Sequence, residues 1–179
     1  DHPALPMTMD VPRLQLNQRL HFDLGAGQVL DGPRRYLLMR ADVLMGCFDD
    51  LPKPARLQAL QALGRAVARQ GGLSVRAYLD ELGPDHLLQA MEDGSASLGW
   101  GCWSLRAEPG ALHLTVLNSP FAAATRHRDE PACHAIAGML GAVAAALWDR
   151  PAHGRELRCA CQARGQAASC QFVATAAPA

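Results

Sequence analysis

The chain has 179 residues with balanced charge, 17 basic against 17 acidic side chains, and it is 49% hydrophobic. This is ordinary globular composition, and at this length one domain is the default. The lack of a basic excess argues against a nucleic-acid-binding protein. No apolar run reaches the roughly 18 residues that a membrane helix needs, and residues 1–10 lack the features of a signal peptide. We therefore expect a cytoplasmic protein with no membrane span and no direct contact to nucleic acid.

The N-terminal third mixes short extended segments with a first helix. Residues 1–20 are dotted with prolines and predict an N-terminal arm, which leaves 21–179 as a single domain. Residues 21–30 contain two glycines and predict a short strand and turn. Residues 35–40 predict a strand that is buried on at least one face. Residues 41–51 then have apolar side chains at helical spacing.

The middle of the chain predicts three more helices in succession. Residues 54–70 carry leucines at helical intervals, and the glycine pair at 71–72 is expected to stop that helix. Ser74 is a suitable N-cap for the next helix, which Gly83 ends. Pro84 opens the last of the three, because proline is favoured in the first turn of a helix.

The C-terminal half changes period and predicts strands around one buried helix. Residues 99–107 and 111–118 predict two strands that are joined by an acidic-Pro-Gly turn. Residues 132–148 form a helix that is apolar nearly all round, which indicates burial on most sides. Residues 154–164 and 169–175 predict a final hairpin. Since helices and strands are segregated, the pattern predicts an α+β fold with an antiparallel sheet packed against a helical layer.

Cysteines near the C-terminus are the sharpest local feature. Four of the six cysteines lie in the last 47 residues: Cys133, Cys159, Cys161 and Cys170. The two in the predicted strand at 159 and 161 share a face, because side chains alternate along a strand. Three or four thiols that converge would suit a tetrahedral zinc site, which Glu156 or His134 can complete. The alternative interpretation is that these thiols are small core residues.

A mostly aromatic set of side chains surrounds the first predicted hairpin. Its members are Trp100, Trp103, His113, Tyr78 and Phe121. Such residues can line an apolar ligand pocket and offer an indole or imidazole N–H as a polar contact. Plain core packing explains the same residues, and the sequence alone favours it.

Catalytic and nucleotide-binding motifs are absent from the sequence. There is no phosphate-binding glycine loop with a lysine, no G-x-S-x-G elbow, no H-E-x-x-H and no dinucleotide fingerprint. The only lysine, Lys53, lies in a Pro-Lys-Pro corner. We therefore expect no nucleotide cofactor and no catalytic residues.

The C-terminal half resembles a known family. Residues 133–140 (CHAIAGML) precede a small-residue helix, and they are followed by Cys-Gln-Ala-Arg-Gly at 161–165 and Cys-Gln-Phe at 170–172. This pattern resembles the 4-vinyl-reductase domain family of hydrocarbon-binding proteins, which is related to the input domains of aromatic-sensing regulators. Residues 99–101 and 118–121 resemble the family's central hairpin, so the resemblance covers about 30–175. It implies the antiparallel fold of ligand-binding domains in nitric-oxide signalling and Golgi transport.

The resemblance also implies a structural zinc. In the family's sensors the ligands are a Cys, a Glu and two further Cys, and the cysteines correspond here to Cys133, Cys161 and Cys170. The family has its Glu three residues before the middle Cys, which is Arg158 here, whereas Glu156 stands three before Cys159. Either the strand shifts or bulges so that Glu156 and Cys159 serve, or the fourth ligand is lost. The expected metal ligands are therefore Cys133, Glu156, Cys161 and Cys170, with Cys159 as the alternative.

The resemblance implies an apolar ligand rather than a phenol. The family's aromatic sensors hold a phenolic hydroxyl with a His and a Trp, and Trp100 or Trp103 matches the Trp. The region 89–98 offers no matching His, and His86 is the nearest. The family name refers to a reductase, but nothing resembles a nicotinamide or flavin site, so the name is no evidence of catalysis.

These observations lead to one expectation and two alternatives. We expect a sensory domain that binds a hydrophobic or aromatic molecule, forms a homodimer, and acts in trans on a partner, because no ATPase or DNA-binding motif is visible. One alternative is an enzyme or accessory protein in tetrapyrrole or aromatic metabolism. The other is a dimeric adaptor.

Overall fold

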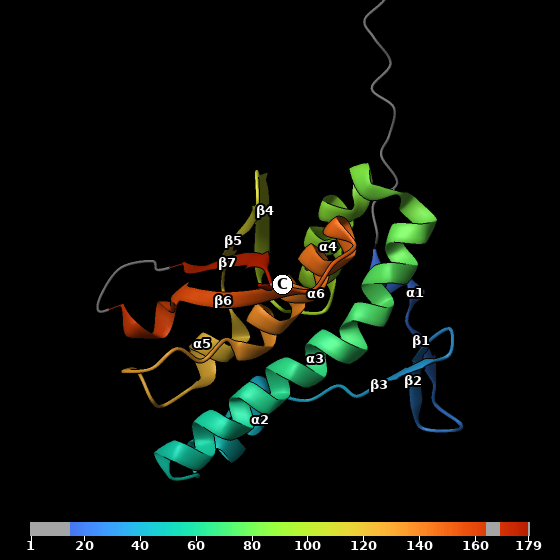
Figure 1. Ribbon diagram of the computed structural model, residues 1–179. Coiled ribbons are helices and arrows are strands. Elements are labelled where there is room, and N and C mark those ends of the chain that lie inside the picture. The colour runs from blue at the N-terminus through green and yellow to red at the C-terminus, as the bar shows by residue number, and fades with distance from the viewer. Residues whose placement is uncertain (1–14, 164–168, 179) are drawn as a thin grey trace, which may run out of the picture.

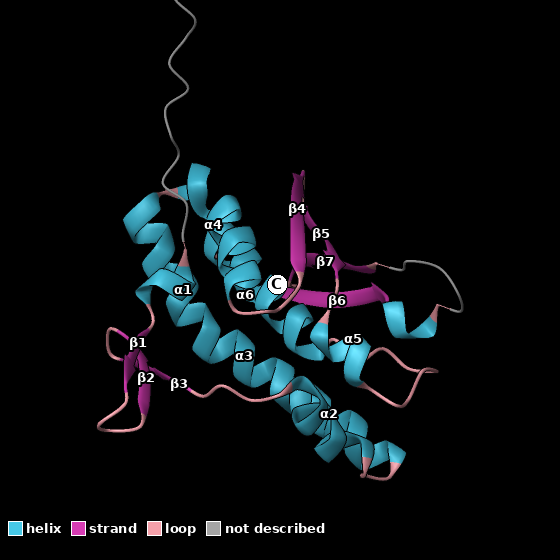
Figure 2. Ribbon diagram, turned by 180° about the vertical axis from the view of Figure 1, so that it is seen from behind, coloured by secondary structure: helices cyan, strands magenta, loops and turns pink. Residues whose placement is uncertain are grey.

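A computed structural model describes residues 15–163 and 169–178 (Figures 1 and 2). The elements in chain order are α1 (Leu16–Arg19), β1 (His21–Asp23), β2 (Gln28–Asp31), β3 (Arg34–Tyr36), α2 (Ala41–Asp49), α3 (Lys53–Leu82), α4 (Pro84–Ser97), β4 (Cys102–Glu108), β5 (Ala111–Leu117), α5 (Pro120–Ala124), α6 (His134–Trp148), β6 (Ala152–Arg158), a 3-10 turn η1 (Ala160–Gln162) and β7 (Cys170–Ala176). None of the described helices combines the length and hydropathy of a membrane-spanning segment.

The strands form two antiparallel sheets on opposite sides of α3 (Figures 1 and 2). The smaller sheet has the order β1-β2-β3, and the larger has the order β4-β5-β7-β6. In the larger sheet, β4 and β5 are adjacent in sequence and pair from Cys102 with Leu117 to Glu108 with Ala111. The α+β class and the antiparallel sheet packed against helices are therefore confirmed.

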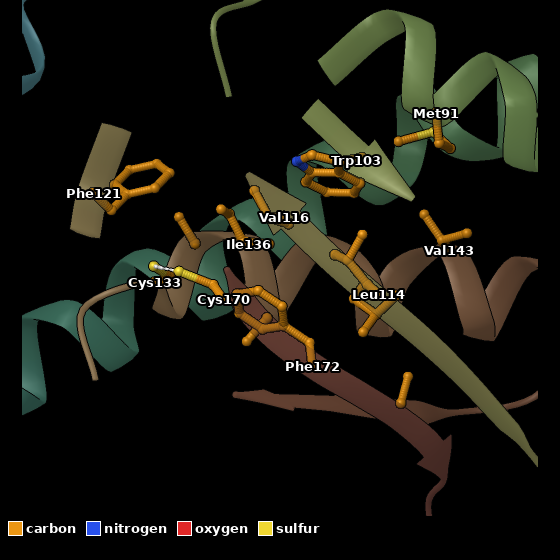
Figure 3. Packing of buried hydrophobic residues seen from close by; sticks show 14 of the residues in the cluster. Met91, Trp103, Leu114, Val116, Phe121, Cys133, Ile136, Val143, Cys170 and Phe172 are labelled. Carbon is orange, nitrogen blue, oxygen red and sulfur yellow. Dashed lines mark hydrogen bonds between the residues drawn. The ribbon is translucent and has the colours of Figure 1, made fainter. Parts of the chain in front are cut away.

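The larger sheet, α6 and α3 form three successive layers. The inner faces of the strands carry Trp103, Leu114, Val116 and Phe172, and all four are buried (Figure 3). Alternation along β5 explains this, because every second residue points toward α6 and is buried. The near-continuous apolar sequence of α6 follows from its position between the sheet and α3.

Glycines let the backbones of these layers approach closely. A Cβ on Gly138 of α6 would lie 2.0 Å from the carbonyl oxygen of Gly64 in α3. On the other side of α6, a Cβ on Gly154 of β6 would lie 2.1 Å from the carbonyl oxygen of Ala137. Real Cβ atoms do not come this close to backbone, so both crossings require glycine.

The glycine pair at 71–72 does not end a helix, and the prediction that it does was wrong. The helix α3 runs without interruption from Lys53 to Leu82. A Cβ at Gly71 would lie 2.6 Å from the methyl carbon of Met139, and one at Gly72 would lie 3.5 Å from Ala142. Packing against α6 therefore outweighs the roughly 1 kcal/mol that each glycine costs inside a helix.

The predicted strand at 35–40 is also mostly wrong. β3 ends at Tyr36, and the apolar residues that follow are exposed: Leu37 at 77%, Leu38 at 67% and Met39 at 52%. The run of apolar residues has no neighbouring layer to cover it, so its hydrophobicity did not indicate burial. Within the expected N-terminal arm, residues 1–14 lie outside the described part, and Leu16 of α1 is buried in the core. The domain boundary at residue 20 stays a prediction.

Candidate functional site

Three thiols and one carboxylate converge at one end of the larger sheet. Cys133 precedes α6, Glu156 lies in β6, Cys159 follows β6, and Cys170 begins β7. Their sulfur and carboxylate oxygen atoms all lie within 4.8 Å of one another. The Cys133 sulfur lies 3.8 Å from that of Cys159 and 3.7 Å from that of Cys170 (Figure 3 shows the latter pair). Such a set has the number and type of donors of a closed tetrahedral zinc site.

A register shift in the hairpin brings Glu156 and Cys159 to this cluster. Glu156 pairs with Phe172, but Arg158, two residues on, pairs with the adjacent Gln171. One extra residue on β6 is the mark of a β-bulge, which re-aims the side chains around it. The chain then leaves the sheet after Arg158 and enters η1, so Cys159 and Cys161 do not share a strand face as the sequence predicted.

The carboxylate of Glu156 has one satisfied and one unsatisfied oxygen. Oε2 accepts the backbone N–H of Cys133 at 3.0 Å, whereas Oε1 is buried without a hydrogen-bond partner in the described part of the chain. Burial raises the pKa of Glu156 to about 8, and the neighbouring Cys159 thiolate raises it further. A buried, unpartnered carboxylate oxygen beside three thiols fits a bound cation, because the cation would supply the missing partner.

The thiols of the cluster differ in acidity. Hydrogen bonding from the Cys133 thiol, then from that of Cys170, lowers the pKa of Cys159. The donor role toward Cys159 correspondingly raises the pKa of Cys133. The cluster therefore concentrates its negative charge on the Cys159 sulfur, which faces both neighbouring thiols.

Cys161 and His134 lie next to this cluster but outside it. The Cys161 sulfur is 3.1 Å from that of Cys159, and its thiol also donates to the carbonyl oxygen of Glu130 at 3.3 Å. The Nε2 of His134 is buried and makes no hydrogen bond within residues 15–163 and 169–178. The geometry thus gathers Cys159, the alternative of the sequence analysis, with the other three residues.

A cavity of about 400 Å³ lies between α3 and α4. Its apolar wall includes Val67 and Val75 from α3, Met91 from α4, Met139 from α6, and Trp100 from the loop before β4. Small residues at the helix faces, such as glycines and alanines, leave this space open. The volume falls within the roughly 300–1,000 Å³ of small-molecule pockets.

Polar but uncharged side chains complete the cavity wall. They are Tyr36, Gln70, Ser74, Tyr78 and Ser95. No charged side chain is among the described residues that line the cavity. The site therefore has the chemistry of an apolar pocket with a few hydrogen-bonding groups.

The predicted aromatic set is divided by the structure. Trp100 and Tyr78 line the cavity. Phe121 packs edge-on against Trp100 with ring centroids 5.3 Å apart, and the indole N–H of Trp103 donates to the carbonyl oxygen of Trp100 at 3.2 Å. His113 lies apart on β5, where its Nε2 is 3.1 Å from a carboxylate oxygen of Glu108.

Sequence reasoning missed the contributions of α4 and α6 to the cavity. Met91, Ser95 and Met139 all line it, and none was a candidate. The buried face of α4 repeats at helical spacing through Leu87, Ala90, Met91, Gly94 and Ser95. A serine and a glycine on an otherwise apolar helix face were the available signal for an incompletely filled interior.

Comparisons with known proteins support the resemblance seen in the sequence. Residues 112–176 match the model of the 4-vinyl-reductase domain. The crystal structure of the phenol-responsive sensory domain of the transcription activator PoxR with phenol has a TM-score of 0.71 and 18% identity, and covers 90% of this chain and 86% of that one. A vinyl-4-reductase family protein from Methanocaldococcus jannaschii has a TM-score of 0.49 and 13% identity, and covers 80% and 98%. No curated protein sequence matches the chain.

The first of these structures shares the fold of nearly the whole chain. The family match covers β5, α5, α6, β6 and β7, which are the elements that carry the cysteine cluster. Over residues 112–176, this chain belongs to the 4-vinyl-reductase domain family.

Proposed function

We propose that this protein is a sensory domain that binds a small hydrophobic or aromatic molecule in the cavity between α3 and α4. The observation that carries the proposal is the cavity itself, about 400 Å³ with an apolar wall and no charged side chain among its described lining residues. Apolar pockets with a few polar groups are the usual form of a small-molecule site. The family match and the shared fold with a phenol-responsive sensory domain support the same conclusion.

The ligand-binding roles fall to residues at the cavity wall. We assign direct contact to Trp100 and Tyr78, which both line the cavity. Phe121 and Trp103 act as positioning residues, because they contact Trp100 by ring packing and by a hydrogen bond. His113 has no such contact and pairs with Glu108, so the proposal gives it no part in binding.

A structural zinc at the cysteine cluster is part of the proposal. Cys133, Glu156, Cys159 and Cys170 would hold it, and Cys161 would stay outside as a hydrogen-bonding neighbour. The orphaned Oε1 of Glu156 supports this set. Held there, the ion would tie the start of α6 to β6 and β7 and so stabilise the hairpin against the helix.

We also propose that the protein forms a homodimer and signals in trans to a partner in the cytoplasm. Exposed apolar residues next to α2 support an interface, since contiguous apolar patches often mark interaction sites. They are Leu37, Leu38, Met39 and Val43. All cysteines are free thiols rather than disulfides, which suits a reducing compartment.

Two measurements test ligand binding. Native mass spectrometry of protein purified without added ligand should reveal an apolar molecule that remains bound. Added tetralin, a neutral bicyclic hydrocarbon, should change the tryptophan fluorescence because Trp100 lines the cavity. The Trp148→Phe variant should keep this change, and Trp100→Phe should lose most of it. Purified protein with no bound molecule and no response to tetralin would contradict the proposal.

A further inference from the structure

We propose that the cavity selects uncharged ligands that carry a hydrogen-bonding oxygen, and that the Ser95 hydroxyl recognises this oxygen. The inference rests on the proposed function, because it concerns the same cavity, and it adds a ligand class and a specificity-determining residue. The first support is the placement of Ser95, which lines the cavity on the buried face of α4 and is only 6% exposed.

The hydroxyl of Ser95 has no partner among the described residues, unlike that of a second serine in the same helix. Ser97 donates to the backbone carbonyl oxygen of Asp93 at 2.9 Å, which is the usual way for a helical serine to satisfy its hydroxyl. Ser95 makes no such bond, although the carbonyl oxygen of Met91 stands four residues before it. A buried hydroxyl without a partner is unfavourable, so a ligand oxygen in the cavity would regain a lost hydrogen bond.

The same serine is fixed relative to the aromatic wall. The backbone carbonyl oxygen of Ser95 accepts the N–H of Trp100 at 2.9 Å, which holds the turn between α4 and β4. Trp100 is in turn held by Phe121 and Trp103. The hydroxyl and the indole ring therefore lie on one rigid segment, which suits recognition of a ring and of an oxygen attached to it.

Charge is excluded by the rest of the wall. The nearest guanidinium to the cavity residue Tyr78 is that of Arg19, which stacks over its ring 5.7 Å from the centroid and pairs with Asp31 at 3.2 Å. Burial raises the pKa of Tyr78, so its phenol also stays uncharged. A carboxylate ligand would lose its hydration without gaining a cationic partner, which makes its burial unfavourable.

The test uses three bicyclic probes of matched shape: tetralin, 1-tetralone and tetralin-1-carboxylate. Isothermal titration of the full chain should show that 1-tetralone binds about tenfold more tightly than tetralin, as expected for one regained hydrogen bond. The carboxylate should bind at least about 100-fold more weakly than the ketone. In Ser95→Ala, tetralin should bind as before and the preference for the ketone should disappear. The control Ser97→Ala should keep the preference.

The outcomes separate this inference from the proposed function. Equal affinity for tetralin and 1-tetralone, a preference that survives in Ser95→Ala, or tight binding of the carboxylate would overturn the inference and leave an apolar binding site intact. If none of the three probes binds, both the inference and the proposed function are contradicted. Tetralin binding by Ser95→Ala also serves as the check that this variant is folded with an open cavity.

Discussion

Cys159 and Cys161 stand two residues apart and have different surroundings. The Cys159 sulfur faces three other donors of the cluster within 4.8 Å, whereas that of Cys161 contacts Cys159 and the backbone of Glu130. A thiol in the centre of a donor set contributes a metal ligand, and one beside it contributes a hydrogen bond to that ligand. This difference makes the two cysteines separable by experiment.

The variant Cys159→Ser should lose bound zinc, while Cys161→Ser should retain it. Elemental analysis should find about one zinc per chain in the wild-type protein and in Cys161→Ser, as a closed structural site requires. For Cys159→Ser the content should fall well below one. The reverse result, loss in Cys161→Ser and retention in Cys159→Ser, would show that the ligand set is the one with Cys161.

The raised pKa of Glu156 predicts a pH effect on the stability of chelator-treated protein. Its carboxyl is protonated in the folded state up to about pH 8 but ionises near 4.5 when unfolded. This contribution is therefore fully present below the unfolded pKa and is lost as the pH rises toward 8. Between pH 6 and pH 8 the wild type should lose about 1–2 kcal/mol more of its free energy of unfolding than Glu156→Gln does.

Urea unfolding at both pH values measures this difference. The Gln variant is the matched control, because its amide fits the same space and does not titrate. An identical loss in both proteins would show that Glu156 is not protonated in the folded, metal-free state.

At the scale of elements, α6 is held by glycines on two sides. The contact of Gly138 with Gly64 and that of Gly154 with Ala137 both bring backbone against backbone. Neither side has a flexible side chain that can move away to make room. The layers α3, α6 and β6 therefore depend on these positions more than on any single large side chain.

The substitution Gly138→Ala should destabilise the protein by about 3 kcal/mol, the upper end of the cost of overpacking, because the new methyl meets the Gly64 carbonyl. The matched control is Gly46→Ala in α2, where a Cβ has nothing within 4 Å. That change should stabilise the protein by up to about 1 kcal/mol through helix propensity. Chemical denaturation of both variants checks this; equal effects would mean that the α3–α6 crossing can relax.

The sequence predicted most elements but not their interruptions. Periodicity found the strands β4 and β5 and the buried helix α6, because local pattern and tertiary position agree there. It split α3 at the glycine pair, since propensity cannot reveal that Met139 and Ala142 pack on those residues. It also made a strand of residues 37–39, because hydrophobicity alone does not reveal whether a covering layer exists.

The candidate site was predictable only in part, for similar reasons. The spacing of Glu156 to Cys159 raised the alternative of a bulge, but only the register with β7 shows one. The cavity depends on how α3, α4 and α6 meet, which no residue pattern encodes directly. Trp100 and Tyr78 were candidates because of their type, whereas Ser95 and Met139 became visible only from the cavity wall.

At the scale of the whole molecule, the apolar segment before α2 remains uncovered. The exposed side chains at 37–39 and at Val43 adjoin Tyr36, which lines the cavity. An interface at this place would be one residue away from the ligand. The proposed dimer and the proposed ligand site are therefore close enough to influence each other.

The variant Leu38→Glu should shift the protein from dimer to monomer in sedimentation or light-scattering measurements. Leu38 is 67% exposed, and a charge there would be buried unpaired between two copies. The control is Leu24→Glu in the turn between β1 and β2, where the side chain is 89% exposed and lies away from this segment. A protein that is monomeric before any substitution, or a Leu38→Glu dimer, would contradict the proposed interface.

The central claim, that the cavity between α3 and α4 binds a small apolar molecule, is tested most directly by methionine methyl NMR. Met91 and Met139 line the cavity, and Met45 is equally buried but lies elsewhere, in α2. Titration with tetralin should shift the methyl signals of Met91 and Met139 in a saturable way and leave that of Met45 unchanged. A titration that leaves the Met91 and Met139 signals in place would contradict the account.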